Sequence, residues 1–353
     1  MRASSICSDL GKSLGEPVSM AAPRVLAVIP GTGTGICLMA ARRQVAALQA
    51  LTVPVETSFF DTRLSPSVLF RSYRDLGQAI MRFRPDVVHV HYGTITGLIC
   101  ALLVNEPLVI TFRGSDLNPE PGVGWLRTRL SVVCSQLAAL RCRKLVCVSR
   151  QLASRLWWKS ESVEIVPAGV DLETFRPIPR IEARRALGWD LEEPVLLFNA
   201  GHAPAVKGLE LAEAVAARVS RSWRIRFEVM RGDVPPEQVP LRMNAADCLL
   251  VTSRSEGSPN VVKEAMACAL PVVSVDVGDV RERLEGVLPS RIVGRDPEDI
   301  AESVLEILAN PIRSNGRKFA AKLSHQSVAK QLLSVYEAVL SDKAELRKSC
   351  PDN

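Results

Sequence analysis

The stretch CLLVTSRSEGSPNVVKEAMACALPVVSVDV, residues 248–277, decides the fold class. It begins with the apolar run CLLVTS and ends with PVVSVDV, and both have the length and β-branched content of buried strands. Between them, the apolar residues of PNVVKEAMACA (259–269) recur at helical spacing. Strand, helix and strand in this order predict a βαβ unit of a parallel sheet covered by helices.

The loop EGS, which joins the first of these strands to the helix, is a predicted ligand site. We expect Ser258 as the N-cap and Pro259 as the first helical residue. Ligands of open parallel sheets bind outside the carboxyl ends of the strands, and a helix N-terminus favours phosphate. Glu264 lies one turn beyond Asn260 on the same helical face and leans back toward it, so it can reach the hydroxyls of a nucleotide. Glu256 would point into the cleft.

Strands and helices alternate in the same way on both sides of this unit. RVLAVIP (24–30) runs into the glycine-rich loop GTGTG (31–35), and a helical pattern follows. Further strands are expected at 53–60, 85–92, 107–114, 144–149, 163–169, 195–201 and 225–232. Helices are expected at 36–51, 72–84, 96–104, 123–142, 207–219, 296–310 and 327–340. The alternation predicts parallel sheets with both faces covered.

The pattern predicts an α/β protein with two Rossmann-like domains. A stretch rich in proline and charge, about 176–193, marks the boundary, so we assign residues 23–185 to the first domain and 186–325 to the second. A helix at 326–342 and a tail at 343–353 follow. Residues 1–22 are polar and lack the apolar run of a signal peptide, so we expect a disordered extension, with Met20 as a candidate translation start.

Cysteine content and hydropathy favour a cytoplasmic protein. The nine cysteines are odd in number and show no C-x-x-C spacing, and we expect them to be reduced. The four histidines do not cluster with cysteines, so we expect no metal site and no cofactor. The most apolar stretch, ITGLICALLV, is too short to span a membrane.

Charge is distributed unevenly along the chain. Residues 1–185 carry 23 basic and 14 acidic residues, a net charge of +9, whereas residues 186–353 carry 21 and 24, a net charge of −3. A basic half predicts an anionic partner. The helix expected at 125–144 has arginines at its ends, and it is interpreted either as a core helix or as a face for an anionic membrane surface, helped by Trp157, Trp158 and Lys159. Nucleic acid is disfavoured because the basic residues are dispersed and no recognition motif accompanies them.

Five segments in order resemble the retaining glycosyltransferase family 4, which has the GT-B fold. The two glutamates of EGSPNVVKE with AMACALPVVSVDVGDVRE resemble its donor motif, and VPAGVDLETFRP (166–177) resembles its NGVD-x-x-x-F-x-P segment. DVVHVH (86–91) with VITFRGSD (109–116), GHAPAVKG (201–208) and the helix at 327–340 are also similar to family segments. The resemblance implies two facing domains, a central cleft and a C-terminal helix that crosses back to the first domain. The stretch PNVVKEAMACALPVVSVDVGDV is similar to the corresponding stretch of bacterial teichuronic-acid and capsule enzymes. This similarity implies cell-surface polysaccharide or glycoconjugate synthesis at the inner membrane face.

The resemblance also implies the site. It suggests a nucleotide-diphosphate sugar as donor and a carbohydrate or lipid-linked acceptor, with Glu256 on the transferred sugar, Glu264 on the ribose and Lys207 on the diphosphate. Retention would proceed without an enzyme nucleophile, and no D-x-D motif is present to hold a metal. The implied donor-binding residues are Gly33, His202, Lys207, Glu256, Gly257, Ser258, Pro259, Asn260, Val261 and Glu264, and Glu256, Lys207 and Arg113 are the implied catalytic residues.

Three features depart from the family. His202 stands where the family usually has arginine, and Arg113 stands where many members have histidine, so Arg113 is a candidate for binding the phosphate or an acidic sugar substituent. The short segment between RFEVM and CLLVTS leaves no room for a strand–helix unit that most members carry near the base. These departures motivate an alternative, a catalytically inactive scaffold that binds a sugar nucleotide or a protein partner.

Some residues keep other interpretations. The loop GTGTG could belong to an NAD site, with Glu56 or Asp61 as the acidic residue that such a site needs. His89 is expected as a satisfied core histidine, whereas His91, nearer the strand end, is a candidate for the cleft. Asp116 is interpreted as a cap of the turn that follows it.

Overall fold

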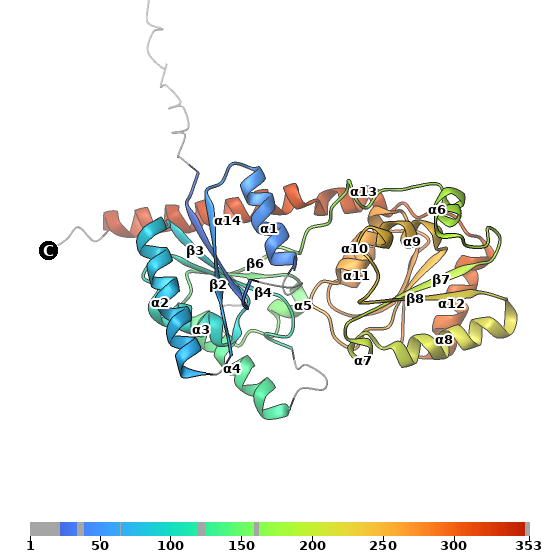
Figure 1. The fold of residues 1–353 in the computed structure, drawn as a ribbon, viewed down its shortest axis with the longest axis horizontal. Coiled ribbons are helices and arrows are strands. Elements are labelled where there is room, and N and C mark those ends of the chain that lie inside the picture. Colours follow the sequence, from blue (N-terminus) through green and yellow to red (C-terminus); the bar gives the residue numbers. More distant parts are fainter. Residues whose placement is uncertain (1–21, 34–38, 64, 119–123, 159–161, 350–353) are drawn as a thin grey trace, which may run out of the picture.

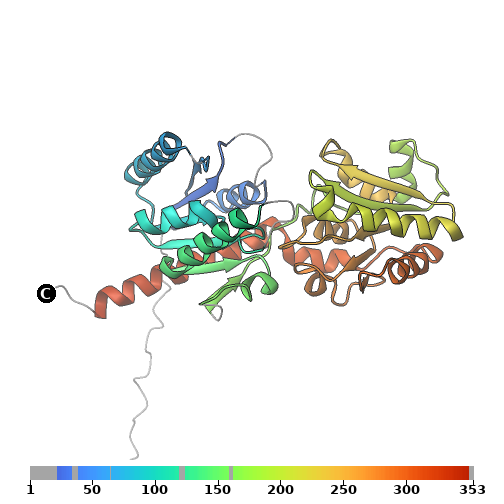
Figure 2. The ribbon, with the colours of Figure 1, turned by 90° about the horizontal axis from the view of Figure 1, so that it is seen from below.

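The computed structural model describes residues 22–33, 39–63, 65–118, 124–158 and 162–349. Two α/β lobes lie side by side along the long axis of the molecule (Figure 1). The view from below shows that a separate sheet forms the centre of each lobe (Figure 2). The predicted fold class, two parallel-sheet Rossmann-like domains, is confirmed.

The first lobe has six parallel strands in the order β2-β1-β3-β4-β5-β6. They are β1 (Val25–Pro30), β2 (Val55–Phe60), β3 (Val87–His91), β4 (Leu108–Phe112), β5 (Lys144–Cys147) and β6 (Val163–Ile165). The helices between them are α1 (Met39–Ala50), α2 (Pro66–Phe83), α3 (Thr94–Leu103), α4 (Trp125–Arg141) and α5 (Arg150–Ala153). Strands β3 and β4 are buried along their whole length because helices cover both faces of the sheet.

The second lobe has five parallel strands in the order β11-β10-β9-β7-β8. They are β7 (Val195–Gly201), β8 (Arg226–Arg231), β9 (Cys248–Val251), β10 (Val272–Val275) and β11 (Arg291–Val293). The helices of this lobe are α6 (Arg180–Leu187), α7 (Pro204–Lys207), α8 (Leu209–Ser222), α9 (Gln238–Ala245), α10 (Asn260–Ala267), α11 (Val280–Leu284), α12 (Pro297–Ala309) and α13 (Gly316–Ala320), followed by the 3₁₀ turn η2 (Ala321–Leu323). Helix α9 connects β8 directly to β9, so the segment that looked short carries one helix and no strand.

The chain enters the second lobe earlier than residue 185. Val170 and Phe175 already belong to the hydrophobic core of the second lobe. In α6, the buried guanidinium of Arg184 bonds Asp247 Oδ2 at 2.7 Å and the carbonyl of Ala245 at 3.0 Å. The expected boundary therefore placed α6 in the wrong domain, because an exposed Pro-rich and charged sequence does not reveal these partners.

Helix α14 (His325–Ser349) returns from the second lobe and runs along the first, as both views show (Figures 1 and 2). Its Val328, Leu332 and Tyr336 share a hydrophobic core with Val25 of β1 and Val87 of β3. This crossing back was expected from the resemblance. The helix ends later than the expected residue 342, so most of the expected tail at 343–353 is helical up to Ser349.

Gly208 divides the helix that was expected at 207–219. It has φ +75°, and a Cβ at this position would overlap the carbonyl group of Thr252. Only glycine combines this left-handed backbone with such close contact. The division matters because it leaves Lys207 at the end of the short helix α7, facing the loop after β9.

Two further expectations concern the chain as a whole. The six cysteines in the described part of the chain are buried, as was expected, whereas Cys7, Cys37 and Cys350 lie outside it. The expected N-terminal extension also falls outside it, apart from residue 22. Among the described helices, none is long and apolar enough to cross a bilayer.

Candidate functional site

The strand order of the second lobe reverses between β7 and β9, and the space outside the carboxyl ends of these two strands is named the crevice. The chain leaves β7 toward β8 on one side and later returns to β9 on the other. Ligands of open α/β sheets bind at such a reversal of strand order. The two loops at this point contain Lys207, which ends α7, and Glu256, which follows β9.

Lys207 and Glu256 form an ion pair across the crevice. Lys207 Nζ lies 2.6 Å from Glu256 Oε1, and the hydroxyl of Ser253 donates to the same oxygen at 2.8 Å. The side chains are 27% and 13% exposed, so the pair is partly shielded from water. The structure thus brings together two residues that are 49 positions apart in sequence and that were both expected in the site.

The N-terminus of α10 opens onto the same crevice. Asn260 is the first helical residue and Pro259 is the N-cap, so the expectation of Ser258 as N-cap was wrong. The side chain of Ser258 does not cap the helix, because it donates to Asp279 Oδ2 at 2.7 Å instead. The first N–H groups of a helix have no intrahelical acceptor, which makes those at Asn260 and the buried Val261 suitable for a phosphate. The side-chain Oδ1 of Asn260 is also buried, with no partner among the described residues.

A buried lysine holds this loop, and the sequence analysis did not find it. Lys263 is fully buried, and its ammonium donates to Ser258 Oγ at 2.9 Å and to the carbonyl of Ser258 at 3.3 Å. Asp279 accepts from Ser258 and also pairs with Arg283 at 2.9 Å. Burial lowers the pKa of Lys263 to about 8, against the attraction of Asp279. The lysine precedes Glu264 in the motif, but its partners lie on other elements.

Glu264 occupies the expected face of α10. Burial raises the pKa of its carboxyl group, and Arg43 of α1, Lys263 and Lys207 partly oppose the rise. A carboxylate with a raised pKa is under-solvated and gains from hydroxyl groups that donate to it. Arg43, from the first lobe, is a further candidate site residue that no sequence motif indicates.

The two lobes touch at the loop that carries Glu256. A Cβ on Gly257 would overlap the carbonyl oxygen of Arg113, and a Cβ on Gly114 would lie 3.5 Å from the backbone nitrogen of Gly257. Asn118 Nδ2 donates to the carbonyl of Glu256 at 3.4 Å. Gly257 is therefore needed for the close approach of the first-lobe loop after β4, which places that loop beside the crevice.

The side chain of Arg113 turns into the first lobe. Its Nη2 donates to Gln44 Oε1 and, at 2.9 Å, to Nδ1 of His91. A guanidinium has only donors, so Nδ1 of His91 carries a lone pair and Nε2 carries the proton. The atoms Arg113 Nε, Gln44 Nε2 and His91 Nε2 are buried and have no hydrogen-bond partner among the described residues. Burial lowers the pKa of Arg113 to about 10.

His91 is fully buried, so its side chain does not line an open cleft. His89 is the satisfied core histidine that was expected: Nδ1 lies 2.6 Å from the hydroxyl of Tyr336 on α14, and Nε2 lies 2.7 Å from that of Thr111. Burial lowers the pKa of His89 to about 3, and the charge of Arg113 adds to the effect. Burial, with His89 and Arg113 nearby, also lowers the pKa of His91 well below its ordinary value, so both histidines are neutral at physiological pH.

Asp116 has a larger structural role than a cap. Its carboxylate accepts from the backbone N–H groups of Gly93, Arg113 and Gly114, at 3.2, 3.0 and 2.8 Å. It thus ties the loop after β3 to the loop after β4. Burial raises its pKa although these bonds oppose the rise.

The structure does not gather the other two expected residues at the ion pair. His202 is exposed, and its ring packs over Gly232 at the end of the edge strand β8, on the side of β7 away from β9. Gly33 has φ +83° and packs against the ring of Phe59, and residues 34–38 of its loop lie outside the described residues. Glu56 and Asp61, considered for an NAD site, pair with Arg82 and Arg63. Among the residues that the structure describes, no three His, Cys, Asp or Glu side chains gather as a metal site requires.

Comparison with known proteins matches each lobe to a family. Residues 36–174 match the model of Glycosyltransferase Family 4, and residues 200–310 match that of Glycosyl transferases group 1. The chain is 29% identical over 313 residues to a D-inositol 3-phosphate glycosyltransferase of Geodermatophilus obscurus, covering 73% of this chain and 68% of the relative. It is 28% identical over 260 residues to the putative teichuronic acid biosynthesis glycosyltransferase TuaC of Bacillus subtilis, covering 65% and 64%. Among solved structures, Anabaena HepE in complex with UDP and glucose shares the fold, with a TM-score of 0.67 at 16% identity over 89% of this chain and 99% of that one.

Proposed function

The chain belongs to the family 4 and group 1 glycosyltransferases, and we propose that it transfers a sugar from a nucleotide-diphosphate sugar to a hydroxyl acceptor with retention of configuration and without a metal. The observation that carries the proposal is the meeting of Lys207, Glu256 and the N-terminus of α10 at one crevice. A cation, a hydrogen-bond acceptor and free N–H groups are what a sugar diphosphate needs. HepE, a protein of the same fold, has a crystal structure in complex with UDP and glucose.

Each residue then has a role toward the donor. The N–H groups at Asn260 and Val261 hold the distal phosphate, Glu264 accepts from the ribose hydroxyls, and Glu256 accepts from the transferred sugar. Lys207 neutralises the charge that develops on the diphosphate as it leaves, the task that a divalent ion performs in other enzymes. Arg113, with its unpartnered Nε, adds positive potential from the first lobe.

Retention follows if the acceptor attacks the face that the nucleotide leaves. The bond from the anomeric carbon to the diphosphate oxygen breaks, and the bond to the acceptor oxygen forms on the same face. The hydroxyl proton moves to an oxygen of the leaving diphosphate, so no general base from the protein is needed. Glu256→Ala should cut turnover, and activity near that of the wild type would refute the role of Glu256.

We further propose a cell-surface polysaccharide or glycoconjugate as the product and the inner membrane face as the place of reaction. TuaC is named for teichuronic acid synthesis. In this chain, Leu126, Leu130 and Leu137 of α4 are 68%, 60% and 42% exposed, and arginines stand at both ends of the helix. Flotation with liposomes tests this: binding to anionic liposomes supports it, and absence of binding to both anionic and neutral liposomes would sink it.

Donor binding is tested by thermal stabilisation with UDP, GDP, ADP and CMP nucleotides and their sugars, without metal. A rise in Tm with one diphosphate that is lost in Glu264→Ala identifies the base and supports the site. The position of His202 over Gly232, away from Lys207, favours the inactive scaffold as second candidate. Tight nucleotide binding without turnover or donor hydrolysis would favour that scaffold, whereas slow donor hydrolysis would exclude it.

A further inference from the structure

A cavity of about 360 Å³ lies at the carboxyl edge of the first sheet, apart from the crevice of the second lobe. The ends of β1 to β4 and the N-terminal half of α4 enclose it. Its lining residues are Pro30, Thr62, Tyr92, Thr94, Ile95, Ser115, Arg127, Thr128, Leu130, Ser131 and Cys134.

The lining chemistry selects a polyhydroxylated and anionic ligand. Six of the lining residues carry hydroxyl groups, Arg127 is the one cation, and none of the described lining residues is acidic. Thr128 Oγ1 is buried and has no partner among the described residues. Arg127 and Thr128 stand in the first turn of α4, a helix of 17 residues whose N-terminal N–H groups also favour an anion.

The wall of the cavity is held in a strained conformation. Tyr92 has φ 124° and Thr94 has φ 54°, both in the region that non-glycine residues rarely adopt. Between them, a Cβ on Gly93 would collide with the side chains of Ser135 and Phe112. The hydroxyl groups of Tyr92 and Ser115 are hydrogen-bonded to each other across the cavity wall. Strain of this kind persists where the surrounding structure enforces it, and it gathers at ligand sites.

The cavity lies beside the donor crevice. Ser115 of its wall follows Gly114, and Gly114 approaches the backbone of Gly257. Asn118, at the end of the same loop, bonds the carbonyl of Glu256. A sugar hydroxyl in the cavity therefore lies on the side from which Glu256 and its ion pair can be reached.

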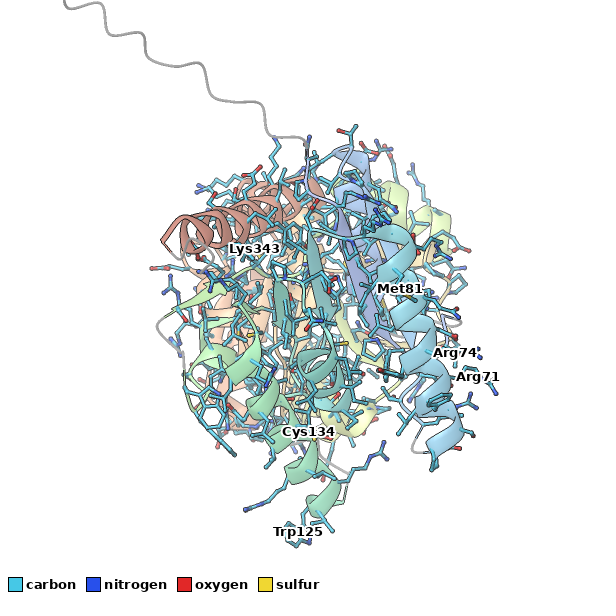
Figure 3. All side chains as sticks on the ribbon, turned by 90° about the vertical axis from the view of Figure 1, so that its left-hand side faces the viewer. Arg71, Arg74, Met81, Trp125, Cys134 and Lys343 are labelled. Carbon is cyan, nitrogen blue, oxygen red and sulfur yellow. The ribbon has the colours of Figure 1, made fainter. Side chains whose placement is uncertain are left out.

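An exposed apolar ridge begins at the cavity mouth. Leu130 lines the cavity and is 60% exposed, and Trp125 and Leu126 are 71% and 68% exposed. Figure 3 shows that Trp125 stands at the tip of α4, which projects beyond the body of the lobe. The ridge continues at Val133, Leu137 and Leu140, with spacings of three and four residues that keep one face of the helix.

The charge of α4 decides between two occupants of this ridge. The helix contains three arginines and no acidic residue. A second copy of the chain packed on the ridge would bring these arginines together without carboxylates from the helix to balance them. An amphiphile with an anionic head and an apolar tail matches both the arginines and the ridge.

We propose that the cavity is the acceptor site, and that it takes the phosphate-linked sugar of a lipid whose tail follows the ridge Trp125-Leu126-Leu130. The proposal deepens the proposed function and rests on it. Arg127 and the N-terminus of α4 hold the phosphate, the hydroxyl groups orient the sugar, and the bilayer supplies the tail. A free phosphorylated polyol would use the same head-group chemistry without the ridge.

Farnesyl diphosphate is a suitable probe, with farnesol and inorganic diphosphate as its separate parts. Binding to the full chain is measured by thermal shift in the presence of the nucleotide that the donor panel identifies, so that the donor crevice is filled. We expect farnesyl diphosphate to raise Tm, and Arg127→Ala to weaken its binding about tenfold or more. Arg224→Ala is the control, because Arg224 is an exposed arginine of the second lobe and does not line the cavity.

The results of the binding experiment separate the proposal from its alternatives. Equal affinity of the wild type and Arg127→Ala for farnesyl diphosphate would overturn the proposal. Inorganic diphosphate binding as tightly as farnesyl diphosphate would overturn the lipid and favour a free phosphorylated acceptor. Leu130→Ser should weaken farnesyl diphosphate but not inorganic diphosphate. Failure of every nucleotide in the donor panel would instead count against the proposed function, and the same probes without nucleotide would still test the cavity.

Discussion

The ammonium nitrogen of Lys207 lies 2.6 Å from Oε1 of Glu256, and each residue comes from a loop on a different side of the strand-order reversal between β7 and β9. Glu256 neutralises a partly buried lysine that would otherwise carry an unbalanced charge. When a diphosphate enters, Lys207 can exchange one anionic partner for another at little cost in charge. In the proposed reaction, this exchange would leave Glu256 to accept from the sugar.

Lys207→Ala should lower kcat about 100-fold, because it removes the cation that faces the leaving diphosphate. The measurement is initial rate against donor concentration, with the nucleotide found by thermal shift. Arg254→Ala is the control, since Arg254 pairs with the exposed Glu210 near the same crevice. In a double-mutant cycle with Glu256→Ala, strictly additive losses would contradict a working pair.

Glu264→Gln should make the protein more stable and the donor site weaker. Because the pKa of Glu264 is raised on folding, its ionised form destabilises the folded state, and this penalty grows as pH rises through the raised pKa. We expect Tm at pH 7 to rise by about 1–3 °C in the variant, with the difference vanishing near pH 4. The nucleotide-induced shift should be lost. A variant that binds nucleotide as the wild type does would remove Glu264 from the site.

The pKa of Lys263, about 8 in the folded protein, predicts a pH signature of its own. The unfolded chain holds this proton up to the ordinary value of 10.5, so between these pH values the unfolded state binds more protons and stability rises with pH. Lys263→Met should remove this rise, whereas Lys322→Met, at an exposed position, should keep it. Thermal melts from pH 7.5 to 10 measure the difference, and parallel curves for the wild type and Lys263→Met would contradict the assignment.

Tyr336→Phe tests how α14 is fixed to the first lobe. The change removes the partner of His89 Nδ1, 2.6 Å away, and leaves a buried polar atom unsatisfied. We expect a loss of about 1–3 kcal/mol in the free energy of unfolding, measured by urea denaturation. Ser334→Ala, on the exposed side of the same helix, should cost under about 0.5 kcal/mol. Equal stabilities of the two variants would mean that the His89–Tyr336 bond contributes nothing.

Most strands and helices could be predicted from the sequence, because the spacing of apolar residues follows which positions of a strand or helix are buried. Lys207, Glu256 and Glu264 were predicted as site residues because each lies in a motif with a local signature, and the structure places Lys207 and Glu256 in contact. The role of Ser258 was missed because Asp279, its partner, is 21 residues away and a capping rule considers neighbours only. The division at Gly208 depends on contact with Thr252, and helical periodicity alone does not contain that contact.

Contacts between side chains of different helices and strands could not be predicted from the sequence. Gln44 meets Arg113 from 69 positions away, and nothing in the helix around Gln44 marks it. Arg113 was predicted as a site residue from its position in a motif. The direction of its side chain, into the first lobe, is set by its hydrogen bonds to His91 and Gln44. The domain boundary was misplaced for the same reason, because α6 is assigned by its contacts with Asp247 and Ala245.

Arginines beside the ridge of α4 should contribute to the binding of anionic membranes. Arg129, near the start of α4, and Arg143, two residues beyond its end, are exposed, and each arginine near an anionic surface contributes about 1 kcal/mol. Replacing both by glutamine should therefore weaken binding to anionic vesicles roughly tenfold or more, measured by flotation at low salt. The control is Arg221→Gln with Arg224→Gln, which removes two exposed charges from the second lobe and so matches the change in net charge; it should leave binding unchanged. If the control weakens vesicle binding as much as Arg129→Gln with Arg143→Gln does, the overall charge of the protein sets its attraction to the vesicles. In that case the ridge does not orient the enzyme. Binding that resists 0.5 M salt in the double variant would show that the apolar face of α4 dominates over its arginines.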